Sequence, residues 1–277
     1  MGETAGFLEI LPENYRLLQQ SVYANVGIVV QDDKEYLFKG RLAPVVKQLG
    51  LNSINELCSV LQKPGQSDVA QMVGEAMTTN ETYFFREPLH YEAIKKHLLP
   101  RLIAERPVHR RMSFWSAASS TGQEAYSLAM LLLEQELQDW TVHILGTDIS
   151  NKVIERARKG LYQQIEVNRG LPAPMLVRHF HRTGMDWQLS EAVRRMVHFR
   201  NLDLRQEMRT IGPFDLVFCR NVMIYFDAET KRKMLQDLHS TLFRGGWLLL
   251  GGAETPVEYD PWFERCSIGG ATVYVAR

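Results

Sequence analysis

The clearest pattern of apolar and polar positions spans residues 113–148 and predicts a strand, a turn, a helix and a second strand. An apolar run with Phe114 and Trp115 leads into the small-residue turn 118–122. Leucines then recur at the spacing of a helix that buries one face. A second apolar run, 142–146, is followed by Asp148. We therefore expect a β-turn-α-β unit here.

Further apolar runs predict that strands and helices alternate over much of the chain. In chain order we expect a helix at 91–103, a helix at 152–159, strands at 197–204 and 214–221, a helix at 229–243, a strand at 247–251, and strands at 263–267 and 271–275 joined by two glycines. The run 214–221 is apolar almost throughout, as a strand buried on both faces requires. This pattern predicts an α/β fold with a doubly wound, Rossmann-like sheet of the methyltransferase type, closed by an antiparallel hairpin.

Two stretches depart from this alternation. Residues 1 to about 75 carry helical stripes, one with Leu42 and Val46 and another that Asn52-Ser53 would cap. Residues 161–195 predict a small inserted β-hairpin, with arms at 176–181 and 187–191. We expect a small all-helical domain with its linker over residues 1–88, and a cofactor-binding catalytic domain over residues 89–277 that contains the insertion.

Composition narrows the classes of function. Lys plus Arg and Asp plus Glu both number 32, so no net charge draws the protein onto a nucleic acid or an anionic membrane. Three cysteines that lie far apart in the sequence predict reduced thiols. No apolar run is long enough to span a bilayer, and no basic region followed by an apolar core stands at the N-terminus, so we expect no secretory signal. We expect a cytoplasmic protein with no insertion in the membrane.

The turn 118–122 and Asp148 together predict a nucleoside-containing cofactor. Small residues allow the backbone to approach a ligand, and an acidic side chain after the next strand can accept hydrogen bonds from a ribose. The turn contains a single glycine, Gly122, whereas a pyrophosphate cradle needs several. S-adenosylmethionine has a ribose and an adenine but no phosphate, so its site needs the turn and the acidic residue but not the phosphate-binding glycines. An ordinary strand-to-helix turn without a ligand remains the alternative on this stretch alone.

Three further loops should meet the turn at one edge of the sheet. The carboxyl ends of the predicted strands carry Asp148, Asp203-Leu204 and Arg220-Asn221. Upstream, Arg86 follows two adjacent phenylalanines, and it either pairs with a carboxylate or belongs to an aromatic hinge between domains. His179 and His181 would share one strand face, but no third ligand follows at zinc-like spacing, so we predict no metal.

Four motifs, in this order, closely resemble the chemotaxis receptor methyltransferases of the CheR type. They are Asn80-Glu81-Thr82-x-Phe84-Phe85-Arg86, Trp115-Ser116-Ala117-Ala118-x-Ser120-Thr121-Gly122-x-Glu124-x-Tyr126-Ser127, Thr147-Asp148-Ile149, and Phe214-Asp215-x-x-Phe218-Cys219-Arg220-Asn221-Val222-x-Ile224-Tyr225-Phe226. The resemblance covers the chain from about residue 36 to its end. It implies methyl transfer from S-adenosylmethionine to glutamate side chains of bacterial chemoreceptors, with S-adenosylhomocysteine as the product.

The resemblance also implies the roles of individual residues. Cofactor binding would involve Asn80, Thr82, Arg86, Glu124, Asp148, Asp203, Leu204, Arg220 and Asn221. Of these, Asn80, Thr82 and Arg86 would hold the methionine part, and Asp148 the ribose. Asp203 stands where the family has an asparagine, and either side chain can accept a hydrogen bond from the adenine amino group. Tyr225 would lie near the reacting methyl group, so Tyr225 and Arg86 are the candidate catalytic residues.

The expected partner is the cytoplasmic helical region of a chemoreceptor, bound by a monomeric enzyme. Two features depart from the family pattern: the basic face formed by Lys39, Arg41 and Lys47 is sparse, and the inserted hairpin is short. A methyltransferase of another protein, a nucleic acid or a small molecule is the rival enzyme class, and a signalling regulator that binds the cofactor without turnover is the rival outside enzymes.

Overall fold

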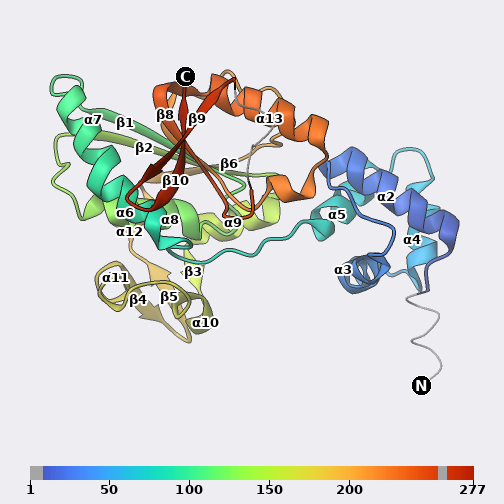
Figure 1. Ribbon diagram of the computed structural model, residues 1–277. Helices are drawn as coiled ribbons and strands as arrows, with labels where there is room; N and C mark the ends of the chain where they lie inside the picture. The colour runs from blue at the N-terminus through green and yellow to red at the C-terminus, as the bar shows by residue number, and fades with distance from the viewer. Residues whose placement is uncertain (1–8, 255–260) are drawn as a thin grey trace. The chain divides into compact units, whose positions relative to one another are not determined.

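The computed structural model describes residues 9–254 and 261–277, which form two compact units (Figure 1). The smaller unit consists of the chain up to Thr79 together with Tyr225–Thr230. The larger unit contains Asn80–Ile224 and Lys231–Arg277. Among the described residues, no helix combines the length and the apolar character that spanning a membrane requires.

The smaller unit is helical, as the apolar stripes predict. Its helices are α2 (Pro12–Val26), α3 (Glu35–Gln48), α4 (Ile54–Leu61) and α5 (Ser67–Met77). Fully buried side chains such as Leu18, Phe38 and Leu57 form its core. The predicted cap of α4 is present, because the hydroxyl of Ser53 accepts the backbone N–H of Glu56 at 3.0 Å.

A seven-stranded mixed sheet forms the centre of the larger unit, in the order β6-β2-β1-β7-β8-β10-β9. The strands are β1 (Arg111–Ala117), β2 (Thr141–Asp148), β6 (Val197–Asn201), β7 (Phe214–Cys219), β8 (Leu242–Leu250), β9 (Phe263–Ile268) and β10 (Ala271–Ala276). The pairs from β6 to β8 are parallel, whereas β10 is antiparallel to both of its neighbours. The doubly wound sheet with a terminal antiparallel hairpin is thus confirmed.

Helices cover this sheet and complete the α/β alternation (Figure 1). They are α6 (Pro88–Ala93), η1 (Ile94–Leu98), α7 (Leu99–Glu105), α8 (Gln123–Leu133), α9 (Asn151–Lys159) and α13 (Ala228–Ser240). The first three form one continuous helical stretch with a π-helical turn. Pro100, at the start of α7, has no N–H to donate to the preceding turn, which favours such an irregularity.

Several predicted boundaries are wrong in this part of the chain. The strand expected at 214–221 ends at Cys219, and the strand expected at 247–251 spans Leu242–Leu250. The helix expected at 229–243 ends at Ser240, and β8 already begins at Leu242, because Phe214 pairs with Leu242 across the sheet. The strand expected at 197–204 ends at Asn201, so Asp203 and Leu204 lie in the loop that follows β6. Tertiary pairing overrides local periodicity at these places.

The core of the sheet is apolar and closely packed. All six residues of β7 are buried, as expected for a central parallel strand. Trp115 on β1 is fully buried against Phe214, with ring centroids 5.6 Å apart, and its indole N–H donates to the hydroxyl of Thr147 at 3.0 Å. The strand ends that carry the candidate residues therefore rest on a rigid base.

The insertion forms a separate lobe of the larger unit beside the main sheet (Figure 1). Its three-stranded sheet contains β3 (Leu161–Tyr162), β5 (Asp186–Leu189) and β4 (Phe180–Thr183), in that order, and its helices are α10 (Gln164–Val167), α11 (Ala173–His179) and α12 (Glu191–Arg194). The predicted hairpin is present as β4–β5, but residues 176–179 of its expected first arm are helical. His179 and His181 consequently do not share a strand face.

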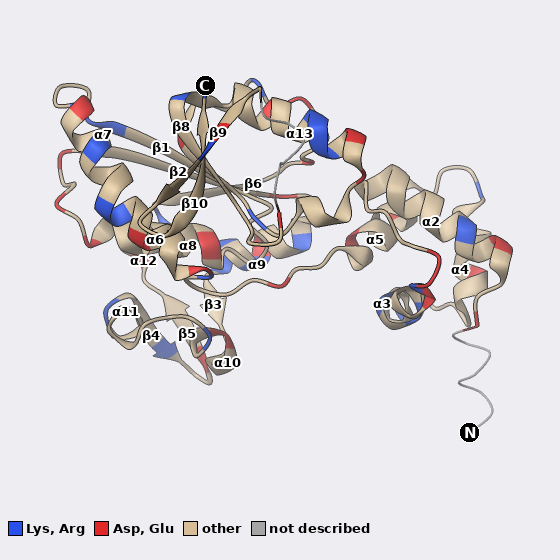
Figure 2. Cartoon of the chain, in the orientation of Figure 1, with Lys and Arg blue, Asp and Glu red and all other residues tan. Residues whose placement is uncertain are grey.

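Charged residues of both signs are interspersed along both units (Figure 2). One of the buried carboxylates, that of Asp215, is only 1% exposed, and it accepts two hydrogen bonds from the guanidinium of Arg106 and one from the backbone N–H of Ser113 at 2.8 Å. It thereby connects the end of α7, the start of β1 and the start of β7.

Replacing Asp215 should therefore destabilise the fold. Asp215→Ala should lower the free energy of unfolding by about 2–4 kcal/mol, because it leaves a partly buried guanidinium and a backbone N–H without their acceptor. Asp139→Ala is the control: its pair with Arg110 is exposed, with 77% and 47% of the two side chains accessible. That control should lose less than about 1 kcal/mol. Denaturant titration measures both losses, and equal losses would contradict this account of Asp215.

Candidate active site

The turn after β1 is held in an unusual conformation by Asp148. Ala118, Ser120 and Gly122 all have positive φ, of 56°, 49° and 93°. One carboxylate oxygen of Asp148, at the end of β2, accepts the backbone N–H of Ser120 at 2.9 Å, and the other accepts the N–H of Ser150 at 3.0 Å. The turn and the acidic residue that the sequence linked are therefore in direct contact.

Glycines allow this turn to lie close to the sheet. A Cβ atom on Gly146 of β2 would lie 2.5 Å from the ring of Phe199, and one on Gly122 would lie 3.0 Å from the Cβ of Ala157. Larger residues at either position would push the turn away from β2 and from Asp148.

A buried arginine lies at the end of β7, next to the turn. The Arg220 side chain is 1% exposed, and its guanidinium is 3.2 Å from the carboxylate of Glu124 and 3.7 Å from that of Glu87. Burial alone would lower the pKa of Arg220, but these carboxylates outweigh it and raise that pKa. The guanidinium therefore stays charged.

Glu124, in the first turn of α8, is the principal partner of Arg220. The hydroxyl of Ser116 donates a hydrogen bond to its carboxylate at 2.7 Å. Burial raises the pKa of Glu124, while Arg220 and Ser116 oppose that shift. The Arg220–Glu124 ion pair is thus almost completely buried, next to the ends of β1 and β7.

The segment 80–87 is fastened to these elements through its backbone. The carbonyl of Asn80 accepts the hydroxyl of Ser120 at 3.0 Å, and the carbonyl of Arg86 accepts a guanidinium N–H of Arg220 at 2.6 Å. The N–H of Phe85 donates to the hydroxyl of Ser127 at 2.9 Å. This segment therefore forms one wall of the site.

Backbone strain is concentrated at this site. Of the six non-glycine residues with positive φ in the described ranges, five surround it: Phe85, Glu87, Ala118, Ser120 and Asn221. Each such conformation costs on the order of 1 kcal/mol or more and persists where the surrounding contacts enforce it. Such clustering is typical of a binding or catalytic site.

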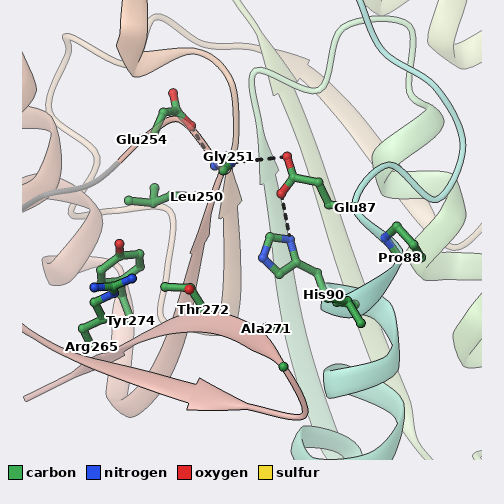
Figure 3. Close-up of a pocket in the computed structure, with 13 residues that line it drawn as sticks. Glu87, Pro88, His90, Leu250, Gly251, Glu254, Arg265, Ala271, Thr272 and Tyr274 are labelled. Atoms are coloured by element: carbon green, nitrogen blue, oxygen red, sulfur yellow. Dashed lines mark hydrogen bonds and ion pairs between the residues drawn. The ribbon is translucent and has the colours of Figure 1, made fainter.

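A cavity of about 420 Å³ is lined by residues of α6, β8 and β10 and by Glu87 (Figure 3). Glu87 points into it, with its carboxylate 3.4 Å from Nδ1 of His90 and 3.4 Å from the N–H of Gly252. Burial, with a contribution from the charge of Arg220, lowers the pKa of His90 to about 4. This imidazole is therefore neutral at physiological pH.

Five of the predicted site residues take part in these contacts: Asn80, Arg86, Glu124, Asp148 and Arg220. Asn221 follows Arg220 in the loop after β7 and has a φ of 58°. Thr82 lies half-buried in the same segment, 80–87. The guanidinium of Arg86 donates to the carbonyl of Glu81 at 3.2 Å and lies over the ring of Tyr83, 5.5 Å from its centroid.

The other predicted residues have different surroundings. Leu204 is buried, and the carboxylate of Asp203 is held in a fork by the guanidinium of Arg205, with contacts of 3.0, 3.0 and 2.6 Å. Tyr225 belongs to the smaller unit, where its carbonyl accepts the N–H of Val29 at 2.9 Å.

Two comparisons of sequence identify the family. The family model of the CheR methyltransferase SAM binding domain matches residues 80–271, and that of the CheR methyltransferase all-alpha domain matches residues 13–78. The chain belongs to the CheR methyltransferase family. It is a methyltransferase enzyme, and its cofactor is S-adenosylmethionine, as the sequence predicted.

Curated CheR relatives match over nearly their whole length. The chain is 36% identical over 270 residues to chemotaxis protein methyltransferase 1 of Pseudomonas aeruginosa, covering 95% of this chain and 98% of the relative. It is 37% identical over 257 residues to chemotaxis protein methyltransferase Cher2 of Pseudomonas putida, covering 91% and 93%. It is 36% identical over 270 residues to chemotaxis protein methyltransferase of Vibrio parahaemolyticus, covering 95% and 97%.

The CheR site has polar atoms suited to such a cofactor. Within residues 9–254 and 261–277, the buried polar atoms at this edge of the sheet that have no hydrogen-bond partner include Nε of Arg220, Oδ1 of Asn221 and Oγ of Ser119. Buried donors and acceptors are normally paired, so unpaired ones beside a cradle of small residues favour a polar ligand there. No three His, Cys, Asp or Glu side chains of the described residues gather as a metal site.

One important residue, Glu254, escaped the sequence analysis. Its buried carboxylate accepts four backbone N–H groups, from Gly251 at 2.8 Å and from residues 221–223 at 2.6, 2.9 and 2.8 Å. It fixes the loop after β7, where Asn221 has a φ of 58°. A signal existed, since Glu254 follows the predicted strand 247–251 as Asp148 follows its own strand.

Loss of this anion should loosen the loop after β7. In Glu254→Gln an amide NH₂ replaces one accepting oxygen and opposes backbone N–H groups, so we expect the free energy of unfolding to fall by about 2–3 kcal/mol. We expect kcat/KM to fall about tenfold to a hundredfold, because catalysis depends on sub-ångström positioning. Glu264→Gln, on an exposed position of β9, is the control. Unchanged denaturant and turnover measurements for Glu254→Gln would refute the role assigned to it.

Proposed function

We propose that this enzyme transfers the methyl group of S-adenosylmethionine to glutamate side chains of bacterial chemoreceptors, giving glutamate methyl esters and S-adenosylhomocysteine. The observation that carries the proposal is the match of both CheR domain models, together with relatives that are named chemotaxis protein methyltransferases. The modified region is the cytoplasmic helical part of the receptor, and the enzyme acts as a cytoplasmic monomer.

The resemblance to the family assigns the residues that would hold the cofactor, and their chemistry supports the assignment. Asp148 accepts the ribose hydroxyls, and its position beside the N–H of Ser120 supports that role. Asn80, Thr82 and Arg86 hold the methionine part, whose carboxylate suits the fork of a guanidinium. Glu124 and the Arg220-Asn221 pair close the site nearby. Asp203 and Leu204 contact the adenine.

The acceptor needs no general base. The side chain of glutamate has a pKa of about 4.3, so at neutral pH it is already an anionic nucleophile. When bound, S-adenosylmethionine supplies an electrophilic methyl group on a sulfonium. The protein aligns the acceptor oxygen with that group, and such alignment is worth a large part of a barrier. An aromatic ring against a sulfonium would add a favourable cation–π interaction, and Tyr225 is the candidate for that ring.

A nucleic-acid substrate is less well supported. Enzymes that bind nucleic acid carry a basic surface for the phosphates. Here positive and negative side chains are equal in number and interspersed (Figure 2). The chain also has Arg220-Asn221-Val222-Met223 where base-amino methyltransferases usually have an Asn/Asp-Pro-Pro-aromatic motif.

Methyl transfer to receptors is directly measurable. Chemoreceptor-containing membranes incubated with the enzyme and tritium-labelled S-adenosylmethionine should acquire base-labile label, as expected of carboxyl methyl esters. Receptors whose acceptor glutamates are replaced by alanine should acquire none. Label on a nucleic acid or a small molecule, and not on the receptor, would overturn the proposal.

Arg86 offers a test of the cofactor assignment. Arg86→Lys should weaken S-adenosylmethionine binding about tenfold or more, because an ammonium cannot reproduce the two-pronged contact of a guanidinium with a carboxylate. Arg182→Lys is the control, since it also removes a guanidinium that lies over an aromatic ring, 5.0 Å from the centroid of Trp187 in the insertion. Isothermal calorimetry compares the two. Wild-type affinity in Arg86→Lys would favour the hinge interpretation of this residue.

Tyr225 should separate cofactor binding from chemistry. Tyr225→Phe should keep the cofactor affinity and part of the turnover, because the ring face is retained. Tyr225→Ala should bind the cofactor within about threefold of the wild type but lose most of kcat, since alignment matters more in the transition state than in the ground state. Tyr36→Phe, on an exposed tyrosine of α3, is the control.

The pH profile completes this test. Turnover should rise with ionisation of the acceptor glutamate, around pH 4 to 5, and stay flat from pH 6 to 8. Single-turnover rates over this range measure the profile. An inflection between pH 6 and 8 that a Tyr225 substitution abolishes would mean that a protein group accepts a proton.

A further inference from the structure

The insertion is fastened to the cofactor-binding segment through Phe84. This side chain is fully buried, although it lies between the half-buried Tyr83 and Phe85. Its ring meets Tyr162 of β3 edge to face, with centroids 5.0 Å apart, and Phe180 of β4 at 5.6 Å. Aromatic pairs with this geometry contribute about 0.5–1.5 kcal/mol each beyond the burial of their area. Segment 80–86 is therefore packed into the insertion.

The backbone of the insertion also touches this segment, at Gly170. A Cβ atom on Gly170 would lie 2.1 Å from the carbonyl oxygen of Phe84 and 2.9 Å from the ring of Tyr83. Its φ of +78° likewise favours glycine. A nearby ion pair between Arg169 and Glu81 adds little, because both side chains are more than half exposed. The contact at Gly170 admits no side chain.

Tyr162 also contacts the turn 118–122, which lies across the site from segment 80–86. Its hydroxyl donates to the carbonyl of Thr121 at 2.8 Å, within the turn that follows β1. Tyr162 is fully buried, and burial raises the pKa of its hydroxyl, so the hydroxyl remains a donor. One residue of the insertion thus contacts both the turn and the segment that form the cofactor site.

We propose that the insertion holds segment 80–86 against the turn 118–122 in the conformation that binds the cofactor, with Tyr162 and Gly170 as positioning residues. The inference rests on the proposed function in that this segment carries Asn80, Thr82 and Arg86. It gives residues 161–195 a role in cofactor affinity, separate from any role in recognising a protein substrate.

Two glycines of the insertion provide a matched test. Gly170→Ala should raise the dissociation constant of S-adenosylmethionine at least about tenfold, because the added methyl group must displace Phe84. Gly184→Ala is the control: Gly184 has a φ of +63° in the β4–β5 turn, but a Cβ atom there meets nothing within 4 Å. Both variants place an alanine at a positive φ and so lose similar stability from backbone strain. The difference between their affinities for S-adenosylmethionine therefore reports the contact of residue 170 with Phe84. Calorimetry on the full chain measures it, after thermal melts show which variants are folded.

Two tyrosines test the contact between the insertion and the turn 118–122. Tyr162→Phe keeps the ring but leaves the carbonyl of Thr121 without its donor, so cofactor affinity should fall about threefold to tenfold. Tyr126→Phe is the control, because it also removes a buried hydroxyl that donates at 2.8 Å, in its case to the carbonyl of Ala157. Its cofactor affinity should stay within about twofold of the wild type.

Steady-state kinetics separates positioning from general damage. In Gly170→Ala and Tyr162→Phe, KM for the cofactor should rise while kcat at saturating cofactor stays within about twofold of the wild type, as expected when ground-state binding is lost. KM for the receptor should not change. A fall in kcat alone, or a rise in both KM values, would overturn the positioning role.

The outcomes also distinguish this inference from the proposed function. Wild-type cofactor affinity in both Gly170→Ala and Tyr162→Phe refutes the inference, even if Arg86→Lys is defective. Should Gly170→Ala fail to fold, Tyr162→Phe decides alone. If both insertion variants are defective while Arg86→Lys binds normally, the insertion positions the site but the assignment of Arg86 is wrong.

Discussion

The buried guanidinium of Arg220 is the constraint on which the arrangement of this site depends. A charged group that is 1% exposed requires partners, because an isolated buried charge is very costly. Glu124 from α8, Glu87 from the segment before α6 and the carbonyl of Arg86 supply them. These partners come from parts of the chain that are far apart in sequence. The ion pairs and the hydrogen bond of Arg220 therefore also hold segment 80–87 and the start of α8 together at the cofactor site.

Much of this arrangement was predictable because it follows from local patterns and one topological rule. Apolar periodicity located the strands, and the carboxyl ends of parallel strands share one edge, which placed the turn, Asp148 and Arg220 together. The contact between Asp148 and the N–H of Ser120 confirms that the turn and this acidic residue lie together at one edge of the sheet. The four motifs then led to the family and the cofactor.

The remaining features depend on contacts between distant residues. Residues 176–179 looked like a strand arm, yet they end helix α11, and His179 pairs with Glu134 at 3.1 Å. The start of β8 at Leu242 depends on its pairing with Phe214, which no local signal encodes. Glu254 was missed because its four N–H partners belong to a glycine and to a loop more than 30 residues earlier. Its role is visible only once both strand ends are side by side.

The aromatic contact between Phe84 and the insertion has a consequence for how this enzyme can evolve. An insertion in a loop is commonly treated as a module that can be exchanged or deleted without harm to the rest of the domain. Here deletion would uncover Phe84, and it would take away the hydroxyl that the carbonyl of Thr121 accepts. Only replacements that retain an aromatic hydroxyl at position 162 and a close backbone approach at position 170 would preserve the enclosure. Substitutions on the exposed surface of the lobe are therefore free of this constraint. Residues of the lobe that pack on Phe84 and on the turn 118–122 can change only together with the sheet domain.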